Sequence, residues 1–579
     1  MTQTDNRSPD EHAPSPAARL AWILLILATL YFCYFHNLGA IGLVGPDEPR
    51  YAWIARDMAE TREWVTPRLY GQPWFEKPVL YYWGAALCFK IFDVSEVSAR
   101  LPSAVAALLA TLAMAWLARR LYGAETALWL LLLLPTTVGM IGFSHAAAPD
   151  MPFAAMLTIA MVCAAAVVGL VPNEKNPLVP HTPWLALLLL GFSLGLAVLA
   201  KGPAAIILSG GAVLLWALVT KRWRDALRCL HPIAIASFCL SALPWYVLCA
   251  RRNPDFLRVF VIEHNFRRYL TPEFRHLQPF WFYMPILLVA FAPWTLLLLW
   301  SIMGGSLRSW RNRYVSASVI FLVSWPGFCL LFFSLSQSKL PGYALPAVPA
   351  IGLLYVRSFV ALSGRNQFSF RRMISPYLVF GFPMGLILFL ADSKLIAYPH
   401  ASRGLAVVAF VLFLFIAGNL PLFLRHRPEE RSFDLAALGV LPVILTLVLF
   451  PTLASPWLRP DPSGKTLAAE LHAKQIPPDQ IYAGNMRRGQ QFSLSFYLHR
   501  EVADWSAESP KEGYLLLNSR ACSQYVKPPW ACGGEPIQLP LSGWFLFAVR
   551  PALSANGLGG LGVLRGDYNL RNGADRQAR

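Results

Sequence analysis

Charged residues are scarce in this 579-residue chain, since they make up 14% of it, against about 25% in ordinary globular domains. Hydrophobic residues make up 56%, and the mean hydropathy is +0.46. This composition excludes a cytosolic enzyme, a disordered chain and a secreted disulfide scaffold, because none of them carries so much apolar surface. The class that remains is an integral membrane protein with many spans.

Acidic residues are also few: 32 Asp and Glu stand against 50 Lys and Arg, which gives a net charge of +18. In a soluble protein such a charge indicates nucleic acid. Here the basic residues lie in loops between apolar runs, where membrane topology and anionic lipid explain them better. We therefore expect membrane lipids as partners, and no nucleic acid.

The common motifs of soluble chemistry are missing as well. No P-loop, GxGxxG, HExxH or GxSxG run occurs in a credible setting. The nine cysteines show no zinc-type spacing, and seven of them lie in or beside apolar runs, as small core residues do. Cys522 and Cys532 stand in a polar region near the C-terminus, and the sequence leaves open whether they pair.

Thirteen apolar runs approach the ~20 residues that a membrane-spanning helix needs. They lie near 20–38, 98–118, 125–143, 151–171, 184–200, 203–220, 231–249, 281–302, 315–334, 344–362, 376–392, 404–424 and 434–454. Short loops between alternate runs carry clusters of Arg and Lys, which the positive-inside rule places in the cytoplasm. The N-terminus is then cytoplasmic, and an odd number of spans puts the C-terminus outside. No clear cleavage site follows the first run, so we expect it to remain as an anchor.

The predicted organisation has three parts. Residues 1–19 form a cytoplasmic tail, 20–454 an α-helical membrane domain, and 455–579 a small outward α/β domain. Within the last part, 514–517 and 544–549 have the composition of strands.

The first outer loop, 39–97, differs from a simple linker. Its segments 51–60 and 79–92 look amphipathic, and tryptophans alternate with charges between and around them. Such helices tend to lie in the membrane interface. We therefore expect interfacial helices in this loop.

Unusual polar groups gather in the outer loops. Asp47 and Glu48 are adjacent carboxylates after the first run, where they could supply a general base. Acids also favour helix N-termini, so a capping role is the alternative. Glu76 and Lys77 follow two aromatic residues, and Lys77 is either a phosphate ligand or a side chain that snorkels to the interface.

Further candidates stand at the ends of later runs. Asp150 begins one run, where a cap is again the alternative, and Lys201 lies in a tight Gly-Pro turn between two others. The loop 250–280 carries Arg267 and Arg268, whose planar guanidinium groups suit a phosphate or pyrophosphate. Contact with anionic lipid headgroups is the alternative for these arginines.

One more loop supplies Lys339 and Tyr343, a cation and a phenol between two spans. Brought together, the five loops would form one carboxylate-plus-cation site at the membrane surface. Such a site fits an anionic lipid substrate whose leaving group is phosphate. Because the outer face lacks ATP and the chain lacks a nucleotide motif, the energy must come from a preactivated donor.

Taken in order, these stretches resemble one family. The runs PDEPRYA from Pro46, WFEKP from Trp74, DMPF from Asp150 and KLPGY from Lys339 are similar to the 4-amino-4-deoxy-L-arabinose lipid A transferases, in the wider protein O-mannosyltransferase-like GT-C class. The resemblance covers about 40–345. It implies a GT-C membrane fold with about 13 transmembrane helices. It also implies transfer of a sugar from undecaprenyl phosphate to lipid A or another lipid or glycan acceptor, on the periplasmic face of the bacterial inner membrane.

The resemblance also implies roles for single residues. Asp47 would be the general base, and Asp150 would orient or assist. The groups it implies for the lipid phosphate are Lys77, Arg267 (or Arg268) and Tyr343. Glu48, Lys201 and Lys339 complete the candidate set.

A metal ion is a further implication. Glu76 and His264 match positions linked to zinc in the family. Two side chains are few for a zinc site, and a hydrogen bond between this histidine and glutamate is the alternative. The sequence assigns no cofactor, and zinc or another divalent ion stays open.

The sequence departs from the family in places, so the sugar and the acceptor stay open. Pro49 stands where a threonine is common, and Gln337 and Ser338 replace the usual small residue and glycine before Lys339. The alternatives are transfer of another sugar to protein or to another glycan, and a transporter or flippase. A transporter would carry charges near mid-membrane, whereas the charges here gather at the outer ends of the runs.

Overall fold

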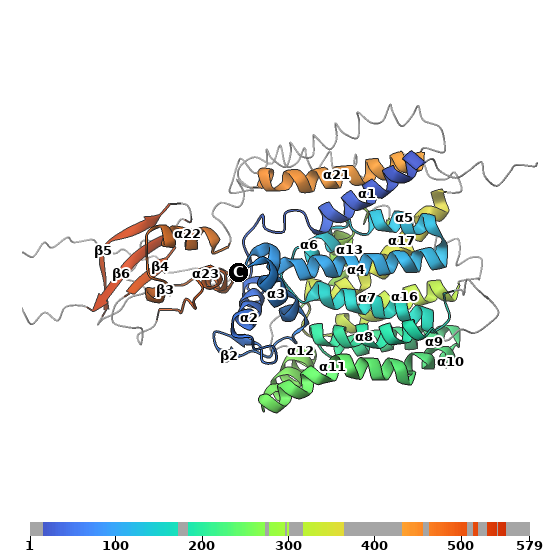
Figure 1. Ribbon diagram of the computed structural model, residues 1–579, viewed down its shortest axis with the longest axis horizontal. Coiled ribbons are helices and arrows are strands. Elements are labelled where there is room, and N and C mark those ends of the chain that lie inside the picture. Colours follow the sequence, from blue (N-terminus) through green and yellow to red (C-terminus); the bar gives the residue numbers. More distant parts are fainter. Residues whose placement is uncertain are drawn as a thin grey trace, which may run out of the picture.

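The protein is seen in a computed structural model, which describes residues 16–171, 183–271, 277–295, 298–299, 316–363, 431–454, 463–505, 513–518, 530–540, 542 and 544–551. A bundle of long helices fills most of it, and a small sheet with two helices lies beyond one end of the bundle (Figure 1).

Seven helical segments in the described part of the chain are long and apolar enough to cross a membrane. They are α1 (Pro16–Tyr34), α4 (Glu96–Tyr122), α7 (Asp150–Val167), α8 (Trp184–Lys201), α11 (Pro232–Arg252), α16 (Ala317–Leu335) and Pro341–Ala361, which joins the 3-10 turn η6 (Pro341–Ala347) to α17 (Val348–Ser363). The chain is therefore a multi-span membrane protein. The predicted runs 376–392 and 404–424 lie outside the described residues, so the count of thirteen stays a prediction.

Further apolar helices accompany these spans. They are α5 (Ala124–Leu133), α6 (Val138–Ser144), α9 (Ala204–Thr220), α13 (Tyr283–Ala290) and α21 (Arg431–Ala454), of which Gly439–Val448 is the apolar part. Short helical turns α10 (Trp223–Leu227) and η2 (Arg228–Leu230) connect α9 to α11.

The predicted run 125–143 is not one straight span. It is divided into α5 and α6, which bend by 62°. Pro135 lies in the break, and proline cannot donate the backbone hydrogen bond that would continue α5. Thr137 then caps α6, because its hydroxyl accepts a hydrogen bond from the amide of Met140 at 3.4 Å.

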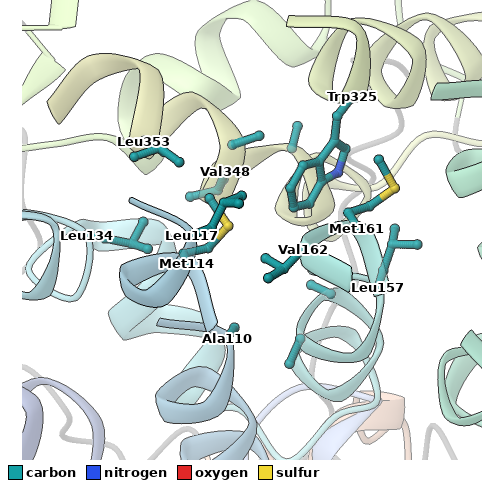
Figure 2. Packing of buried hydrophobic residues seen from close by; sticks show 14 of the residues in the cluster. Ala110, Met114, Leu117, Leu134, Leu157, Met161, Val162, Trp325, Val348 and Leu353 are labelled. Carbon is teal, nitrogen blue, oxygen red and sulfur yellow. The ribbon is translucent and has the colours of Figure 1, made fainter. Parts of the chain in front are cut away.

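The core of the bundle lies between α4, α7, α16 and α17. Figure 2 shows Met114 and Leu117 of α4 with Met161 and Val162 of α7 and Trp325 of α16, all of them at most 4% exposed. In α7, 78% of the membrane-length window is buried, against 28% in α1 and 22% in α11. Therefore α7 is central, while α1 and α11 keep broad apolar faces for lipid. Alanines along α7 allow its neighbours to approach closely.

The first outer loop folds into α2 (Glu48–Thr61), the strands β1 (Arg68–Leu69) and β2 (Gln72–Pro73), and α3 (Leu80–Phe92). The two strands pair antiparallel. The helices predicted at 51–60 and 79–92 therefore correspond to α2 and α3.

The segment predicted as the loop 250–280 is partly helical. It contains the π-helical η3 (Arg258–Arg267) and the short α12 (Arg268–Leu270). Its backbone is fixed to the loop after α16, since the amide of Gln337 donates to the carbonyl of Tyr269 at 3.0 Å. The phenol of Tyr269 also donates to the carbonyl of Phe332, at 2.9 Å.

The C-terminal part contains a four-stranded mixed sheet. Its elements are α22 (Lys465–Ala473), η8 (Pro478–Gln480), β3 (Ile481–Ala483), α23 (Arg488–Leu498), β4 (Gly513–Leu517), β5 (Trp530–Leu539) and β6 (Trp544–Pro551). The strand order is β3-β4-β6-β5, with β3 and β4 parallel and the other pairs antiparallel. The strands predicted at 514–517 and 544–549 are β4 and β6.

The domain boundaries 1–19, 20–454 and 455–579 stay predictions. Seven cysteines are free, and each is buried or half-buried, as the predicted core role requires. Cys522 and the side chain of Cys532 lie outside the described residues, so their pairing stays open.

Candidate active site

The predicted outer loops come together at one end of the helical bundle. α2 and α3 lie there, beside one end of the helices α4, α7 and α8 (Figure 1). One apolar cluster joins several of these segments, and it includes Tyr51 of α2, Tyr81 of α3, Ala147 and Leu199. This packing fixes the polar groups of the loops relative to the helix ends.

Asp47 stands at the N-cap position of α2, but its side chain makes no capping hydrogen bond. Instead its carboxylate contacts the guanidinium of Arg50 at 2.5 Å, and its side chain is 55% exposed. Capping, the alternative raised by the sequence, therefore does not account for this carboxylate. Asp47 is held by a cation and open to an incoming molecule.

Arg50 begins a row of alternating charges. Its second nitrogen lies 3.0 Å from one oxygen of Glu76, and the other oxygen of Glu76 lies 3.8 Å from the ammonium of Lys77. Burial disfavours the guanidinium charge, but Glu76 and Asp47 offset this effect, so the pKa of Arg50 lies above its ordinary value. The side chains of Glu76 and Lys77 are each 13% exposed, so the row is largely buried behind Asp47.

Three buried hydrogen-bond donors lie in or beside this row of charges. They are Nε of Arg50, Nε1 of Trp74 and the phenol of Tyr82, and no described residue accepts a hydrogen bond from any of them. The guanidinium of Arg50 lies 5.3 Å from the ring centroid of Trp74. Buried donors without an acceptor are costly and rare in folded proteins. The group is chemically suited to the oxygens of a ligand.

Glu48, one of the predicted catalytic acids, occupies a structural position. Its carboxylate accepts hydrogen bonds from Nε and Nη2 of Arg100 at 3.1 and 2.8 Å. It also accepts the amides of Val44 at 3.0 Å and Ala147 at 2.8 Å. These contacts occupy both oxygens and argue against a role as proton acceptor. They tie the start of α2 to the loop that leads to Asp150.

Asp150 and Lys201 form the second pair of the site. The carboxylate of Asp150 at the start of α7 lies 2.5 Å from the ammonium of Lys201 at the end of α8. That ammonium also lies 4.6 Å from the ring centroid of Tyr343, a favourable cation–π geometry. The η6 turn passes directly over this pair, since a Cβ added to Gly342 would lie 2.6 Å from the Asp150 carboxylate. A side chain at position 342 would therefore have to displace the Asp150 carboxylate.

Lys339 lies deeper than a surface ligand would. Its side chain is buried, and its ammonium donates to the carbonyl of Ser336 at 2.6 Å, across the turn that ends α16. Arg267 is exposed at the end of η3. The side chain of Arg268 lies outside the described residues, so the choice between these two arginines stays open. The bond between Gln337 and Tyr269 holds both loops together.

The metal site suggested at Glu76 and His264 stays a prediction. In the described ranges, no group of three or more His, Cys, Asp and Glu side chains could hold a metal ion. The carboxylate of Glu76 faces two cations, Arg50 and Lys77. His264 lies in η3 as a half-buried residue. Zinc binds three or four protein ligands, and a carboxylate already paired with cations is a poor donor.

Two arginines of the site were not predicted. Arg50 lies inside the quoted motif but was given no role, and Arg100 lies near the start of the predicted run 98–118. The second could have been found, because an ionisable residue inside an apolar run requires a buried partner. Its partner, Glu48, could not be identified from spacing, since 52 residues separate the two.

Comparison with known proteins shows which family the chain resembles. Residues 20–260 match the family model described as dolichyl-phosphate-mannose-protein mannosyltransferase. The undecaprenyl phosphate-alpha-4-amino-4-deoxy-L-arabinose arabinosyl transferase of Enterobacter sp. (strain 638) is 31% identical over 435 residues, which cover 74% of this chain and 76% of that protein. The protein of the same name from Serratia proteamaculans is 29% identical over 548 residues, covering 91% and 94%.

The similarity to another relative is more limited in extent. With the protein of that name from Edwardsiella ictaluri, the chain is 32% identical over 345 residues, which cover 59% of this chain and 60% of that protein. The crystal structure of ArnT from Cupriavidus metallidurans bound to undecaprenyl phosphate has a TM-score of 0.73 and 23% identity, and covers 91% of this chain and 98% of that one. This likeness shows the fold. The chain belongs to the undecaprenyl phosphate-alpha-4-amino-4-deoxy-L-arabinose arabinosyl transferase family, and it is a glycosyltransferase with a helical GT-C membrane fold.

Proposed function

We propose that this chain transfers 4-amino-4-deoxy-L-arabinose from undecaprenyl phosphate to lipid A, or to a related acceptor at the periplasmic face of the bacterial inner membrane. The observation that carries the proposal is the half-exposed carboxylate of Asp47 beside Arg50, at the edge of a group of buried donors. The relatives support the donor, because their names include undecaprenyl phosphate and 4-amino-4-deoxy-L-arabinose.

In the proposed reaction an acceptor oxygen attacks the anomeric carbon of the sugar. The bond between that carbon and the phosphate oxygen breaks, and undecaprenyl phosphate leaves with the electron pair. A hydroxyl acceptor gives its proton to Asp47, whose exposure leaves one face open to that proton. A phosphate acceptor is already anionic and needs less help from the base.

The leaving phosphate gains negative charge, so it requires cations and donors held in place. Arg50 lies beside Asp47, Lys77 follows in the same row beside Glu76, and the buried phenol of Tyr82 belongs to the same group. Arg267 lies on the loop that meets the η6 turn. We assign the phosphate to these groups together with Tyr343.

Asp150 and Lys201 have a different part in the proposal. Because the two side chains form a close ion pair, each fixes the other at the junction of α7 and α8. The pair can orient the sugar, because the sugar amine would form an ionic contact with the Asp150 carboxylate. Glu48 is a positioning residue in this scheme, since Arg100 and two amides occupy its oxygens.

The proposal includes a topology. We infer thirteen spans, a cytoplasmic N-terminus and a periplasmic C-terminal α/β domain, in an inner-membrane protein. The support is that the predicted outer loops gather at the end of the bundle beside the C-terminal sheet (Figure 1). Further support comes from Ser493 and Tyr497 of the C-terminal part, which contact Leu43 of the loop after α1, as parts on one side of the membrane would.

A second candidate is the transfer of another sugar from a polyprenyl phosphate to protein or to another glycan. It is favoured by the match of residues 20–260 to a model described for protein mannosyltransferases. The chemistry at Asp47 and Arg50 would be the same. The acceptor alone would differ.

The test is mass spectrometry of lipid A from a host that makes the donor and expresses this chain. We expect a pentose-amine mass increment with the wild type, its loss with Asp47→Asn, and its retention with Asp57→Asn, a matched change on the same helix. An increment that survives Asp47→Asn would oppose the assigned base. Unmodified lipid A beside glycosylated protein or another glycan would support the second candidate and overturn the first.

A further inference from the structure

The segment 38–46, which leads from α1 to Asp47, is held by side chains instead of regular secondary structure. Arg100 donates to the carbonyls of Leu38 and Ile41, each at 2.7 Å, and to the carbonyl of Gly42 at 3.0 Å. These contacts come from α4, inside the bundle. The backbone of Leu43, the next residue, forms its hydrogen bonds with other side chains.

Both polar backbone groups of Leu43 bond to α23, about 450 residues later in the chain. The phenol of Tyr497 accepts the amide of Leu43 at 2.9 Å and donates to the carboxylate of Glu96 at 2.7 Å. The hydroxyl of Ser493 donates to the carbonyl of Leu43 at 2.7 Å and accepts the amide of Gly464 at 3.0 Å. Each side chain therefore links the segment to a second element that fixes it.

The first turn of α23 approaches even closer to Asp47. A Cβ added to Gly489 would lie 2.7 Å from the carbonyl carbon of Gly45 and 3.0 Å from the nitrogen of Pro46. The obstacle is backbone, which cannot move aside as a side chain can. Glycine is therefore needed for this contact, and Pro46 is bonded directly to Asp47.

The other end of α23 holds α2. The guanidinium of Arg56 donates to the carbonyl of Phe496 at 3.3 Å, and a second nitrogen contacts Nδ1 of His499. Thus α23 contacts both the chain before Asp47 and the helix after it, and it lies beside α2 in Figure 1. The orientation of Asp47 and Arg50 depends on both contacts, because these residues lie between them.

We propose that Ser493, Tyr497 and Gly489 of α23 are positioning residues for the transfer reaction. They act by holding the backbone at 43–46, which sets the place of the Asp47 carboxylate. This inference rests on the proposed function of Asp47 as the base. A displacement of about 1 Å at a reacting group lowers rates by about a hundredfold, so a loosened segment should reduce turnover while the donor still binds.

The experiment uses the full-length enzyme, purified in detergent, with an undecaprenyl-phosphate-linked aminoarabinose donor and lipid A. Tyr497→Phe removes one hydroxyl, and Ser493→Ala removes another. We expect kcat to fall about tenfold to a hundredfold in each, with KM for the donor within about twofold of the wild type, since neither side chain belongs to the assigned phosphate group. Gly489→Ala should behave in the same way, because its methyl group must push the 45–46 backbone away.

Matched controls separate positioning from folding of the C-terminal part. Tyr482→Phe and Ser542→Ala make the same chemical changes at buried residues of that part. Tyr482 packs against Trp505, and the hydroxyl of Ser542 donates to the carbonyl of Leu539, both within the C-terminal part. We expect both controls to keep the wild-type kcat. Amide hydrogen exchange over 40–48 should rise in Tyr497→Phe and Ser493→Ala and stay unchanged in the controls.

Unchanged kcat in Tyr497→Phe and Ser493→Ala, in an active preparation, would overturn the inference. An equal loss in the controls would also overturn it, because the effect would then be general loss of stability. A wild type that transfers no sugar would overturn the proposed function instead. In that case the exchange measurement still decides whether α23 holds the segment, and no rise over 40–48 would refute the contact.

Discussion

Replacing Arg100 by methionine should be among the most damaging single changes outside the reacting groups. Arg100 is 5% exposed and donates five hydrogen bonds, two to Glu48 and three to the carbonyls of Leu38, Ile41 and Gly42. Methionine fills a similar volume but leaves the Glu48 carboxylate buried without its cation. Removing one partner of a buried ion pair costs about 3–5 kcal/mol.

A second substitution, at Glu48, shows how much of this loss of stability comes from the unpaired carboxylate. In Arg100→Met the carboxylate of Glu48 keeps its hydrogen bonds from the amides of Val44 and Ala147. We therefore expect a loss of unfolding free energy near the lower end of that range. Adding Glu48→Gln removes the buried charge. The double variant should therefore be less destabilised than the sum of the single variants, by a coupling of about 1–3 kcal/mol.

The assay is equilibrium unfolding of the detergent-solubilised chain in a denaturing-detergent titration, followed by tryptophan fluorescence. Sugar transfer is measured beside it. We expect Glu48→Gln to keep measurable transfer and Asp47→Asn to lose it. The reasoning fails if the effects of Arg100→Met and Glu48→Gln add within about 0.5 kcal/mol. Complete loss of transfer in a stably folded Glu48→Gln would restore Glu48 as a catalytic acid.

Three further predictions follow from single contacts. Lys201→Met should lower kcat/KM for transfer about a hundredfold, because Asp150 loses a partner at 2.5 Å; an unchanged value would remove this pair from the site. Burial, and then the charge of Arg56, lower the pKa of His499 below its usual value of 6.5. The stabilising effect of neutral His499 is therefore present above that pH and lost as pH falls below it. Amide exchange in α23, corrected for its intrinsic pH dependence, should rise on acidification, and His499→Gln should abolish this rise. Zinc titrated calorimetrically should bind the wild type no better than Glu76→Gln, since two cations already face that carboxylate; clearly tighter binding by the wild type would contradict this.

The sequence predicted the helical spans well where hydropathy alone decides them. The starts and ends of α4, α7, α8 and α16 lie within a few residues of the predicted runs. It failed at 125–143, because proline is tolerated in many membrane helices and its presence alone does not reveal a bend. At the 62° break a new helix begins after Pro135, and its N-cap is the hydroxyl of Thr137.

The site was predicted in its residue types more than in its pairings. Asp47 and Glu48 are neighbours in sequence and looked equivalent, but successive helical residues point about 100° apart. One carboxylate therefore faces Arg50 near the surface, and the other is buried against Arg100. No local pattern could distinguish the two, because the second partner arrives from another helix.

The contacts of α23 with the segment before Asp47 could not be predicted from the sequence either. Its contacts with Leu43 and Gly45 join residues about 450 positions apart, and no periodicity signals them. Glycine at position 489 carries the one local hint, since a glycine in the first turn of a helix weakens that helix. Its use becomes apparent only when the backbone of Pro46 is placed against it.

The charges of the site explain why an anionic donor would be retained there. Asp47 and Glu76 share Arg50, and Asp150 is paired with Lys201, so these cations already have acidic partners. Lys339 is different, because its ammonium is bonded to the neutral carbonyl of Ser336 and is buried. No carboxylate of the described part of the chain contacts it. A buried cation without an acidic partner is costly, and an arriving phosphate lowers that cost. In the proposed reaction the ion pairs fix the geometry of the groups assigned to the phosphate, and Lys339 adds attraction for the donor because its own partner is neutral.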